Sequence, residues 1–355
     1  MAKQKLKINL GAFDLAKGFG IVVVVLLHSM SSYAEPPAAL DLFFKFLTII
    51  APGIMPMFLI LLGYRFRETA PRKLLKKTVQ EYLIPYGGVM LGYAIVYPIV
   101  MMVLWKSWPN AVQETMRFVF AFLLGLSKEG FVYFGYTLRF CAAAWFFLAS
   151  FLALNLLNLI AKVKNRIVQV VLVCLCVFLG YVLISCNIYF YCIPQCLISI
   201  IYCYIGYCIK QYSLLERMVS NIWSYVILTP IAFAEAIWGY FDIASGTFNH
   251  FLPDCLGAAC SGLLFMLLLV GVGQYDGGVI DFLKKIGTYS YWILTIHSVE
   301  MMAIPWIHWP GLFPNRTLLA YVLELLIRIV LFVVYCAVCK KISLLRYKKR
   351  VSKYK

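Results

Sequence analysis

Three polar residues of the first apolar segment share one face of a helix. Lys17 and His28 are eleven positions apart, and eleven helical steps return to within about 20° of the same direction while rising about 16 Å. Asp14 lies within about 40° of that stripe and can pair with Lys17 at the i,i+3 spacing. A neutral imidazole accepts protons near physiological pH. The stripe therefore predicts an acid–base group, His28, farther along the helix than the pair of Asp14 and Lys17. The alternative is a structural imidazole that is hydrogen-bonded to a neighbouring helix.

A second histidine lies in an equally apolar context. His297 is about midway along an apolar segment in IGTYSYWILTIHSVE, with Ser290 before it and Glu300 one turn after it. Ionisable groups at membrane depth usually face a bundle interior or a cavity and mark functional sites. We therefore expect the two imidazoles to line one cavity. The remaining histidines, His250 and His308, fall in expected outer loops, where solvation explains them more simply than catalysis does.

Four further charged residues lie in or beside apolar segments. Glu324 and Arg328 are spaced i,i+4, so their simplest role is to neutralise each other. Glu235 has no obvious local partner and is a minor candidate for the cavity. Arg139 is expected to pair across helices or to extend to the lipid headgroups.

The composition requires these residues to be carried by membrane helices. Hydrophobic residues make up 63% of the 355 residues and charged residues 13%, with a mean hydropathy of +0.86. This balance lies well outside that of soluble domains. A helical span needs about 20 mainly apolar residues, so the sequence predicts an all-α polytopic membrane protein with about ten transmembrane helices. The expected spans are 12–34, 41–64, 79–105, 137–161, 167–186, 188–209, 220–241, 254–273, 286–305 and 317–339.

The distribution of basic residues predicts the orientation of the chain. Short cytoplasmic loops keep Lys and Arg, whereas loops on the outer side lose them. With the N-terminus inside, 25 of the 32 basic residues fall on the cytoplasmic side, eight of them in a basic tail over residues 340–355. Both termini are therefore expected in the cytosol.

Residues 106–136 are too broken for a clean span. We interpret them as an outer loop with a short amphipathic helix at the membrane interface. If residues 115–135 crossed the membrane instead, the basic segments 162–166 and 340–355 would face outward, against the distribution of positive charge.

The first segment also has features of a cleavable signal peptide. Ser32, Tyr33 and Ala34 precede Glu35 after an apolar run, as they would at a cleavage site. The run is long for a signal peptide and has charged residues at its base, so we predict that it is retained.

The net charge of +17 needs no nucleic-acid partner, because topology and anionic inner-leaflet lipids explain most of it. The twelve cysteines lie almost wholly inside expected spans, where a thiol behaves as a small apolar side chain. The close pairs Cys192 with Cys196 and Cys336 with Cys339 lack the context of a metal site. We expect neither a disulfide framework nor a metal.

Four segments resemble the acyltransferase 3 family of membrane-integral acyltransferases. FDLAKGFGIVVVVLLH is similar to its first helix, where an arginine precedes a histidine by eleven positions. Lys17 takes the place of that arginine, which keeps the charge but loses the bidentate fork, and Leu62 stands where a serine is common. PGIMPMFLILLGYRFR with KKTVQEYLIPY resembles the second helix, the basic loop and the entry to the third. AAAWFFLASFLALNLL and IGTYSYWILTIH resemble the Trp-Phe-Leu segment and the late Gly-x-x-Ser-x6-His motif.

The resemblance implies transfer of an acyl group, most often acetyl from acetyl-CoA, to a hydroxyl of a cell-envelope glycan or a lipid-linked sugar. It implies one transmembrane acyltransferase domain over residues 1–355, acyl-CoA as co-substrate and no tightly bound cofactor. The expected location is the plasma or inner membrane of a bacterium.

The candidate site residues divide into two catalytic imidazoles and a set that binds substrate. His28 is the candidate general base, with His297 as the second catalytic residue. Direct transfer and a covalent acyl-histidine both remain open. Cations on the cytosolic side suit the phosphates of CoA, whose arm would follow the stripe from Lys17 to His28. The binding candidates are Lys17, Asp14, Arg65, Arg67, Ser290 and Glu300.

A transporter or flippase is the competing class, because the same polar stripe can guide a proton or a lipid headgroup. Transporters often contain paired repeats or broken helices in both halves. The sequence has no visible repeat, although Pro52 and Pro56 interrupt the second expected span.

Overall fold

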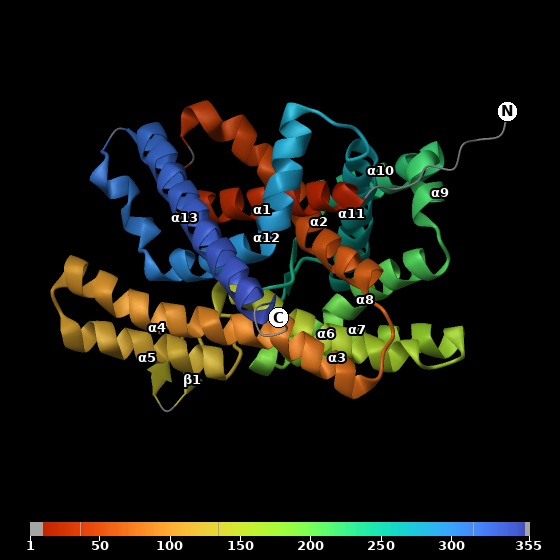
Figure 1. Ribbon diagram of the computed structural model, residues 1–355, viewed down its shortest axis with the longest axis horizontal. Helices are drawn as coiled ribbons and strands as arrows, with labels where there is room; N and C mark the ends of the chain where they lie inside the picture. The colour runs from red at the N-terminus through yellow and green to blue at the C-terminus, as the bar shows by residue number, and fades with distance from the viewer. Residues whose placement is uncertain (1–9, 36, 134, 315, 352–355) are drawn as a thin grey trace.

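The computed structural model describes residues 10–35, 37–133, 135–314 and 316–351, which fold mainly as α-helices (Figure 1). This confirms the all-α prediction. Two short antiparallel hairpins interrupt the helices, β1 (Val132–Tyr133) with β2 (Tyr136–Thr137) and β3 (Phe241–Asp242) with β4 (Thr247–Phe248). The α-helices are α1 (Leu10–Met30), α2 (Asp41–Arg65), α3 (Pro71–Thr78), α4 (Ile84–Trp105), α5 (Trp108–Leu123), α6 (Trp145–Ala161), α7 (Arg166–Ser185), α8 (Ile193–Gln211), α9 (Leu215–Ser220), α10 (Ile222–Trp238), α11 (Phe251–Val272), α12 (Gly278–Ala303) and α13 (Thr317–Val351).

Eight helical segments in the described part of the chain are long and apolar enough to cross a membrane. They coincide with eight of the ten expected spans. The expected span 220–241 corresponds to α10, a shorter apolar helix of 17 residues. The expected span 286–305 falls within α12, which begins earlier and includes three charged residues in its first turns, Asp281, Lys284 and Lys285.

The segment after the second span forms one long helix. α3 runs through a π-helical turn, η2 (Val79–Leu83), into α4, so residues 71–104 form a continuous segment of 34 residues. The helix thus begins before the expected span 79–105, because Pro71 starts a basic helical segment, α3, whose polar residues give no sign of a span in the sequence.

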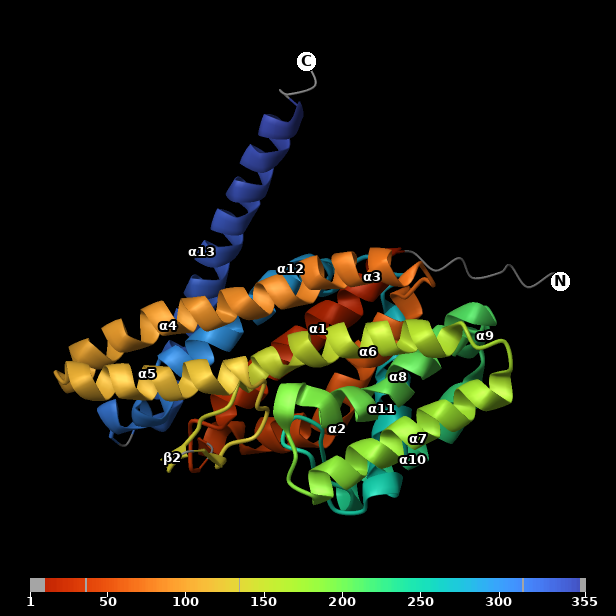
Figure 2. The same ribbon diagram turned by 90° about the horizontal axis from the view of Figure 1, so that it is seen from below.

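α5 is the helix that was expected between the third and fourth spans, and in the structure it packs against another helix. It packs along α4, as Figures 1 and 2 both show. The Tyr86 hydroxyl donates to the Phe122 carbonyl at 2.7 Å, and the rings of Tyr93 and Phe118 are 4.4 Å apart. The prediction of a helix in this region is confirmed, whereas the structure pairs it with α4. The fourth apolar helix begins at Trp145 after a 3-10 turn, η3 (Ala142–Ala144), and not at 137.

α1 and α12 form the most extensive helix pair of the bundle. They approach so closely at two glycines that a side chain would not fit. A Cβ on Gly18 would lie 1.9 Å from the Leu283 carbonyl oxygen, and one on Gly287 would lie 1.8 Å from the Asp14 carbonyl oxygen. Small residues commonly permit such contacts between membrane helices. This crossing fixes the relative positions of the residues farther along both helices.

α13 extends well beyond the expected span 317–339. Its 35 residues continue as helix through Val351, and its end projects away from the other helices (Figure 2). The segment predicted as a basic tail is therefore helical over residues 340–351, and residues 352–355 lie outside the described chain.

Candidate functional site

The structure brings the two imidazoles of the expected spans together. His28 lies near the end of α1 and is half-buried, whereas His297 on α12 is fully buried. Their ring centroids are 5.3 Å apart, with an angle of 45° between the ring planes. α1 and α12 are in close contact in their first halves, at Gly18 and Gly287. His28 and His297 lie in the second halves of the same two helices, where their rings form a pair.

Glu300 connects this imidazole pair to two other elements. Its Oε1 lies 2.7 Å from His297 Nδ1 and accepts a hydrogen bond from Arg328 of α13. Its Oε2 accepts from Trp306 Nε1 at 2.6 Å. Trp306 lies in the 3-10 turn η5 (Trp306–His308). A carboxylate that binds one ring nitrogen fixes the orientation of the imidazole, as in other acid–base pairs.

Arg328 holds two carboxylates in a buried site. It pairs with Glu324 as its spacing predicts, with Nε to Oε1 at 2.9 Å, but it also binds Glu300. Its guanidinium lies 4.5 Å from the centroid of the Trp306 ring. Arg328 and Glu324 are both 0% exposed. We call Glu300, Trp306, Glu324 and Arg328 the anchor network.

Arg328, Glu324 and Trp306 are not among the residues predicted for the site. The i,i+4 spacing of Glu324 and Arg328 explains their charges by a pair within one helix, so it does not point to a third partner. Nothing in the sequence distinguishes Trp306 from other tryptophans in loops. The informative feature was the presence of charges in an apolar span, which is costly unless they have several partners.

The anchor network has an excess of negative charge. It contains two carboxylates and one guanidinium, so its formal charge is −1 while both imidazoles are neutral. A proton taken up by one of the imidazoles would bring the formal charge of the whole group to zero. Fixed charges that oppose the charge developing in a reaction stabilise its transition state.

The aspartate and lysine of α1 pair at the other end of the helix. Lys17 Nζ lies 2.5 Å from Asp14 Oδ1, which confirms the i,i+3 prediction. The rings of Phe13 and Tyr64 stack with centroids 5.2 Å apart, so the end of α2 lies beside the start of α1. Arg65 therefore lies at the same end of the bundle as this pair and is exposed, as is Arg67 two residues later.

The match to a family model settles the class of the protein. The model of an acyltransferase domain matches residues 10–340, nearly the whole chain. The chain belongs to the acyltransferase 3 family. This confirms the resemblance and makes the chain a membrane acyltransferase. No curated protein and no solved structure matches it.

In this acyltransferase the stripe between Lys17 and His28 is packed. Ile21 is buried, and Val24 packs against residues of α2. Gly18, next to Lys17, is the point where the α12 backbone touches α1. A long substrate arm can follow this stripe only if apolar side chains along it move.

Two further polar residues that were candidates for the site, Ser290 and Glu235, have other neighbours in the structure. The Ser290 hydroxyl donates to the Gly287 carbonyl at 2.9 Å, two helical turns before His297. Glu235 is buried on α10 against Gly239 and Gly257, and its Oε1 has no hydrogen-bond partner among the described residues. Ser290 therefore stabilises its own helix, and Glu235 lies beside α11.

Proposed function

We propose that this acyltransferase transfers an acyl group, acetyl by default, from cytosolic acyl-CoA to a hydroxyl of a cell-envelope glycan or a lipid-linked sugar. The protein would act as a multi-pass protein of the plasma or inner membrane of a bacterium. The observation that carries the proposal is the imidazole pair, with His297 held by a carboxylate and His28 more accessible than its partner.

His28 is the proposed general base. A sugar hydroxyl is a weak nucleophile until a base takes its proton, and imidazole performs this step near neutral pH. His297 is fully buried, so the half-buried His28 is the imidazole that an incoming hydroxyl can meet.

The proposed reaction is acyl substitution. The acceptor oxygen attacks the thioester carbonyl, and its proton passes to His28. The carbon–sulfur bond breaks, the thiolate of CoA leaves, and the proton on the imidazole returns to that sulfur. Glu300 keeps His297 oriented beside His28, so His297 positions the base and shares its electrostatic environment.

Lys17, Arg65 and Arg67 are the proposed binding residues for the phosphates of CoA. They are cations gathered at one end of the bundle, which we assign to the cytosolic side. Charge-assisted hydrogen bonds to phosphate are stronger than neutral ones. Asp14 would position Lys17 through their ion pair.

Labelling of membranes tests the proposal. Membranes that contain the protein are supplied with radiolabelled acetyl-CoA, and incorporation into envelope glycan is compared with that of His28→Ala at equal expression. His250→Ala is the matched control, because His250 is an exposed histidine at the start of α11. We expect loss of label for His28→Ala only. Unchanged incorporation would remove His28 from the mechanism, whereas no incorporation by the unaltered protein would favour the transporter class.

A further inference from the structure

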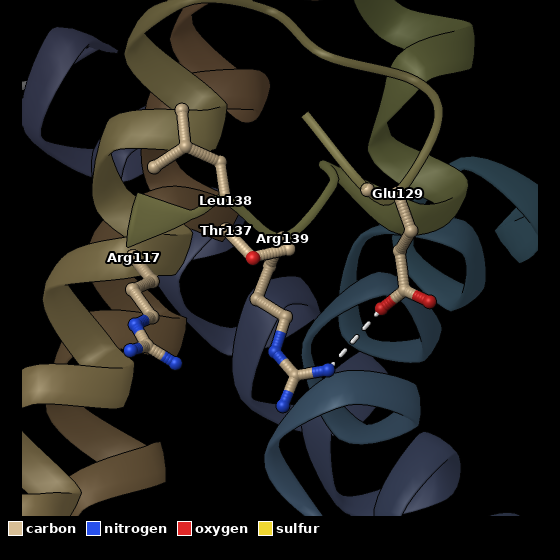
Figure 3. Close-up of a pocket in the computed structure, with 6 residues that line it drawn as sticks. Arg117, Glu129, Thr137, Leu138 and Arg139 are labelled. Carbon is tan, nitrogen blue, oxygen red and sulfur yellow. Dashed lines mark hydrogen bonds and ion pairs between the residues drawn. The ribbon is translucent and has the colours of Figure 1, made fainter. Parts of the chain in front are cut away.

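A polar pocket lies beside α5, away from the imidazole pair. It has a volume of about 360 Å³, which is within the range of small-ligand sites. Figure 3 shows Arg117, Arg139 and Glu129 reaching toward it from α5, from the chain after β2 and from the loop before β1. Thr137 and Leu138 complete this side of the lining. The structure thus presents charged side chains to a cavity outside the site already described.

Carboxylates hold the two guanidiniums in place. Glu114 bridges them, with Oε1 at 2.5 Å from Arg117 Nη1 and Oε2 at 3.2 Å from both Nε and Nη2 of Arg139. Glu129 Oε1 lies 3.4 Å from Arg139 Nη1. Burial alone would lower the pKa of Arg139, but Glu114 and Glu129 outweigh it and raise that pKa above its ordinary value. Arg139 therefore keeps its charge at any physiological pH.

The charged groups retain capacity for a ligand. A guanidinium has five N–H donors, and the four hydrogen bonds to carboxylates leave donors on both arginines. The side chain of Glu129 is 54% exposed, and its contact with Arg139 is made through Oε1. The pocket can thus donate and accept hydrogen bonds at neighbouring positions.

The hairpin next to the pocket carries two aromatic side chains, of which Tyr136 contacts the lining residue Arg117. Tyr133 and Tyr136, paired across β1 and β2, are both about half-exposed. The Arg117 guanidinium lies 6.0 Å from the centroid of the Tyr136 ring. A tyrosine offers an apolar face together with a polar tip. The apolar C–H face of a sugar ring can pack on such a surface while its hydroxyls reach polar groups.

We propose that this pocket binds an uncharged sugar ring of the acyl acceptor. The proposal rests on the proposed function, and it assigns the acceptor to neutral, hydroxyl-rich glycans. A sugar hydroxyl both donates and accepts, so a pair of neighbouring hydroxyls matches the carboxylate of Glu129 beside the guanidinium of Arg139.

The charge of the pocket favours a neutral ring over an anionic one. Two carboxylates already balance the two guanidiniums, so the four groups have no net formal charge. An added carboxylate or phosphate would be repelled by the carboxylates of Glu114 and Glu129, which lie within 3.4 Å of the two guanidiniums. A neutral ring can bind the remaining N–H donors and the exposed Glu129 carboxylate without that repulsion.

The pocket and the imidazole pair are carried by elements in contact with each other. Arg139 lies three residues before η3, and η3 packs against α12, the helix that carries His297. Gly92 of α4 faces Val299, the neighbour of Glu300, since a Cβ there would lie 3.3 Å from the Val299 side chain. These contacts join the pocket and the imidazole pair through one set of packed elements.

Saturation-transfer NMR on the full chain in detergent tests the site without any acyl donor. The probes are the methyl glycosides of glucose, N-acetylglucosamine and glucuronate. We expect signal from the two neutral glycosides and about tenfold weaker binding for Glu129→Gln. The control is Asp276→Asn, an exposed carboxylate that pairs with Lys284 at 3.3 Å and does not line the pocket. This variant should bind like the unaltered protein.

Two outcomes would overturn the assignment. Binding of glucuronate alone would identify an anion site, and equal binding by Glu129→Gln and the unaltered protein would place the sugar elsewhere. Folding of each variant is checked by thermal unfolding in the same detergent, and Thr137→Val serves as a second variant of the pocket. The readout is also distinct from that of the proposed function, because His28→Ala should keep sugar binding while losing acyl transfer.

Discussion

Glu300 lies 2.7 Å from His297 through Oε1 and Nδ1, and the same oxygen accepts a hydrogen bond from Arg328, 28 residues later on another helix. One carboxylate therefore orients the buried imidazole and connects it to α13. A charge at this depth needs several partners to be tolerated, and Glu300 has three, including Trp306. This contact links the stability of the bundle to the orientation of the imidazole pair.

Glu300→Gln should lower kcat for acyl transfer by at least about tenfold and leave KM for acyl-CoA nearly unchanged. The amide can still accept a hydrogen bond from Trp306 but supplies no charge to stabilise a proton on the imidazole pair. Steady-state kinetics in detergent, with KM and kcat determined separately, measures the effect. If KM rose about tenfold while kcat stayed unchanged, Glu300 would contribute to binding of acyl-CoA and not to positioning His297.

Arg328→Met should destabilise the protein by about 3–5 kcal/mol, because it leaves two buried carboxylates without a counter-charge. Adding Glu324→Gln should restore only part of that loss, since Glu300 stays uncompensated. Thermal unfolding in detergent of the single and double variants provides the comparison. Full recovery in the double variant would mean that Arg328 and Glu324 form an isolated pair, as their spacing alone suggests.

The features that could be predicted from the sequence are those that depend on a single helix. Apolar length predicted the spans, and helical geometry placed Asp14, Lys17 and His28 on one face. The depth of His28 and His297 predicted that the two imidazoles would meet, because buried polar groups seek partners inside the bundle. Each of these inferences uses only spacing along the chain and the polarity of the surroundings.

Contacts between distant segments were beyond the sequence. The i,i+4 spacing of Glu324 and Arg328 concealed the contact with Glu300, which depends on how α12 and α13 pack. The position of α5 against α4 depends on aromatic packing between Tyr93 and Phe118. The amphipathic pattern of α5 predicts that one face of the helix is apolar, but it does not predict which helix packs on that face. The same holds for the polar pocket, whose carboxylates and arginines come from separate segments.

Lys17→Gln should raise KM for acyl-CoA about tenfold, which corresponds to the loss of one charge-assisted hydrogen bond. Lys17→Arg should keep KM close to that of the unaltered protein, because the charge remains. Lys45→Gln is the matched control, since Lys45 also pairs with an aspartate of its own helix, Asp41, at 2.7 Å. Lys45 lies near the start of α2, whereas the end of α2 contacts Phe13, about one helical turn before Lys17. A KM for Lys17→Gln equal to that of Lys45→Gln would exclude Lys17 from donor binding.

Gly287→Ala should destabilise the protein by about 1–3 kcal/mol, because the added Cβ would lie 1.8 Å from the Asp14 carbonyl oxygen. The backbone of α1 cannot yield as a flexible side chain would, so α1 and α12 must separate. Gly88→Ala is the control within another helix, α4, where an added Cβ meets nothing within 4 Å and alanine favours the helix. Thermal unfolding in detergent compares the two variants.

The same pair of variants also tests how the site is positioned. Separation of α1 from α12 would increase the distance between the rings of His28 and His297, so acyl transfer should fall in Gly287→Ala even below its unfolding temperature. In Gly88→Ala the helix pair is unchanged, and activity should be retained. If Gly287→Ala lost stability but kept full activity, the close crossing of the two helices would not be what holds the imidazoles together.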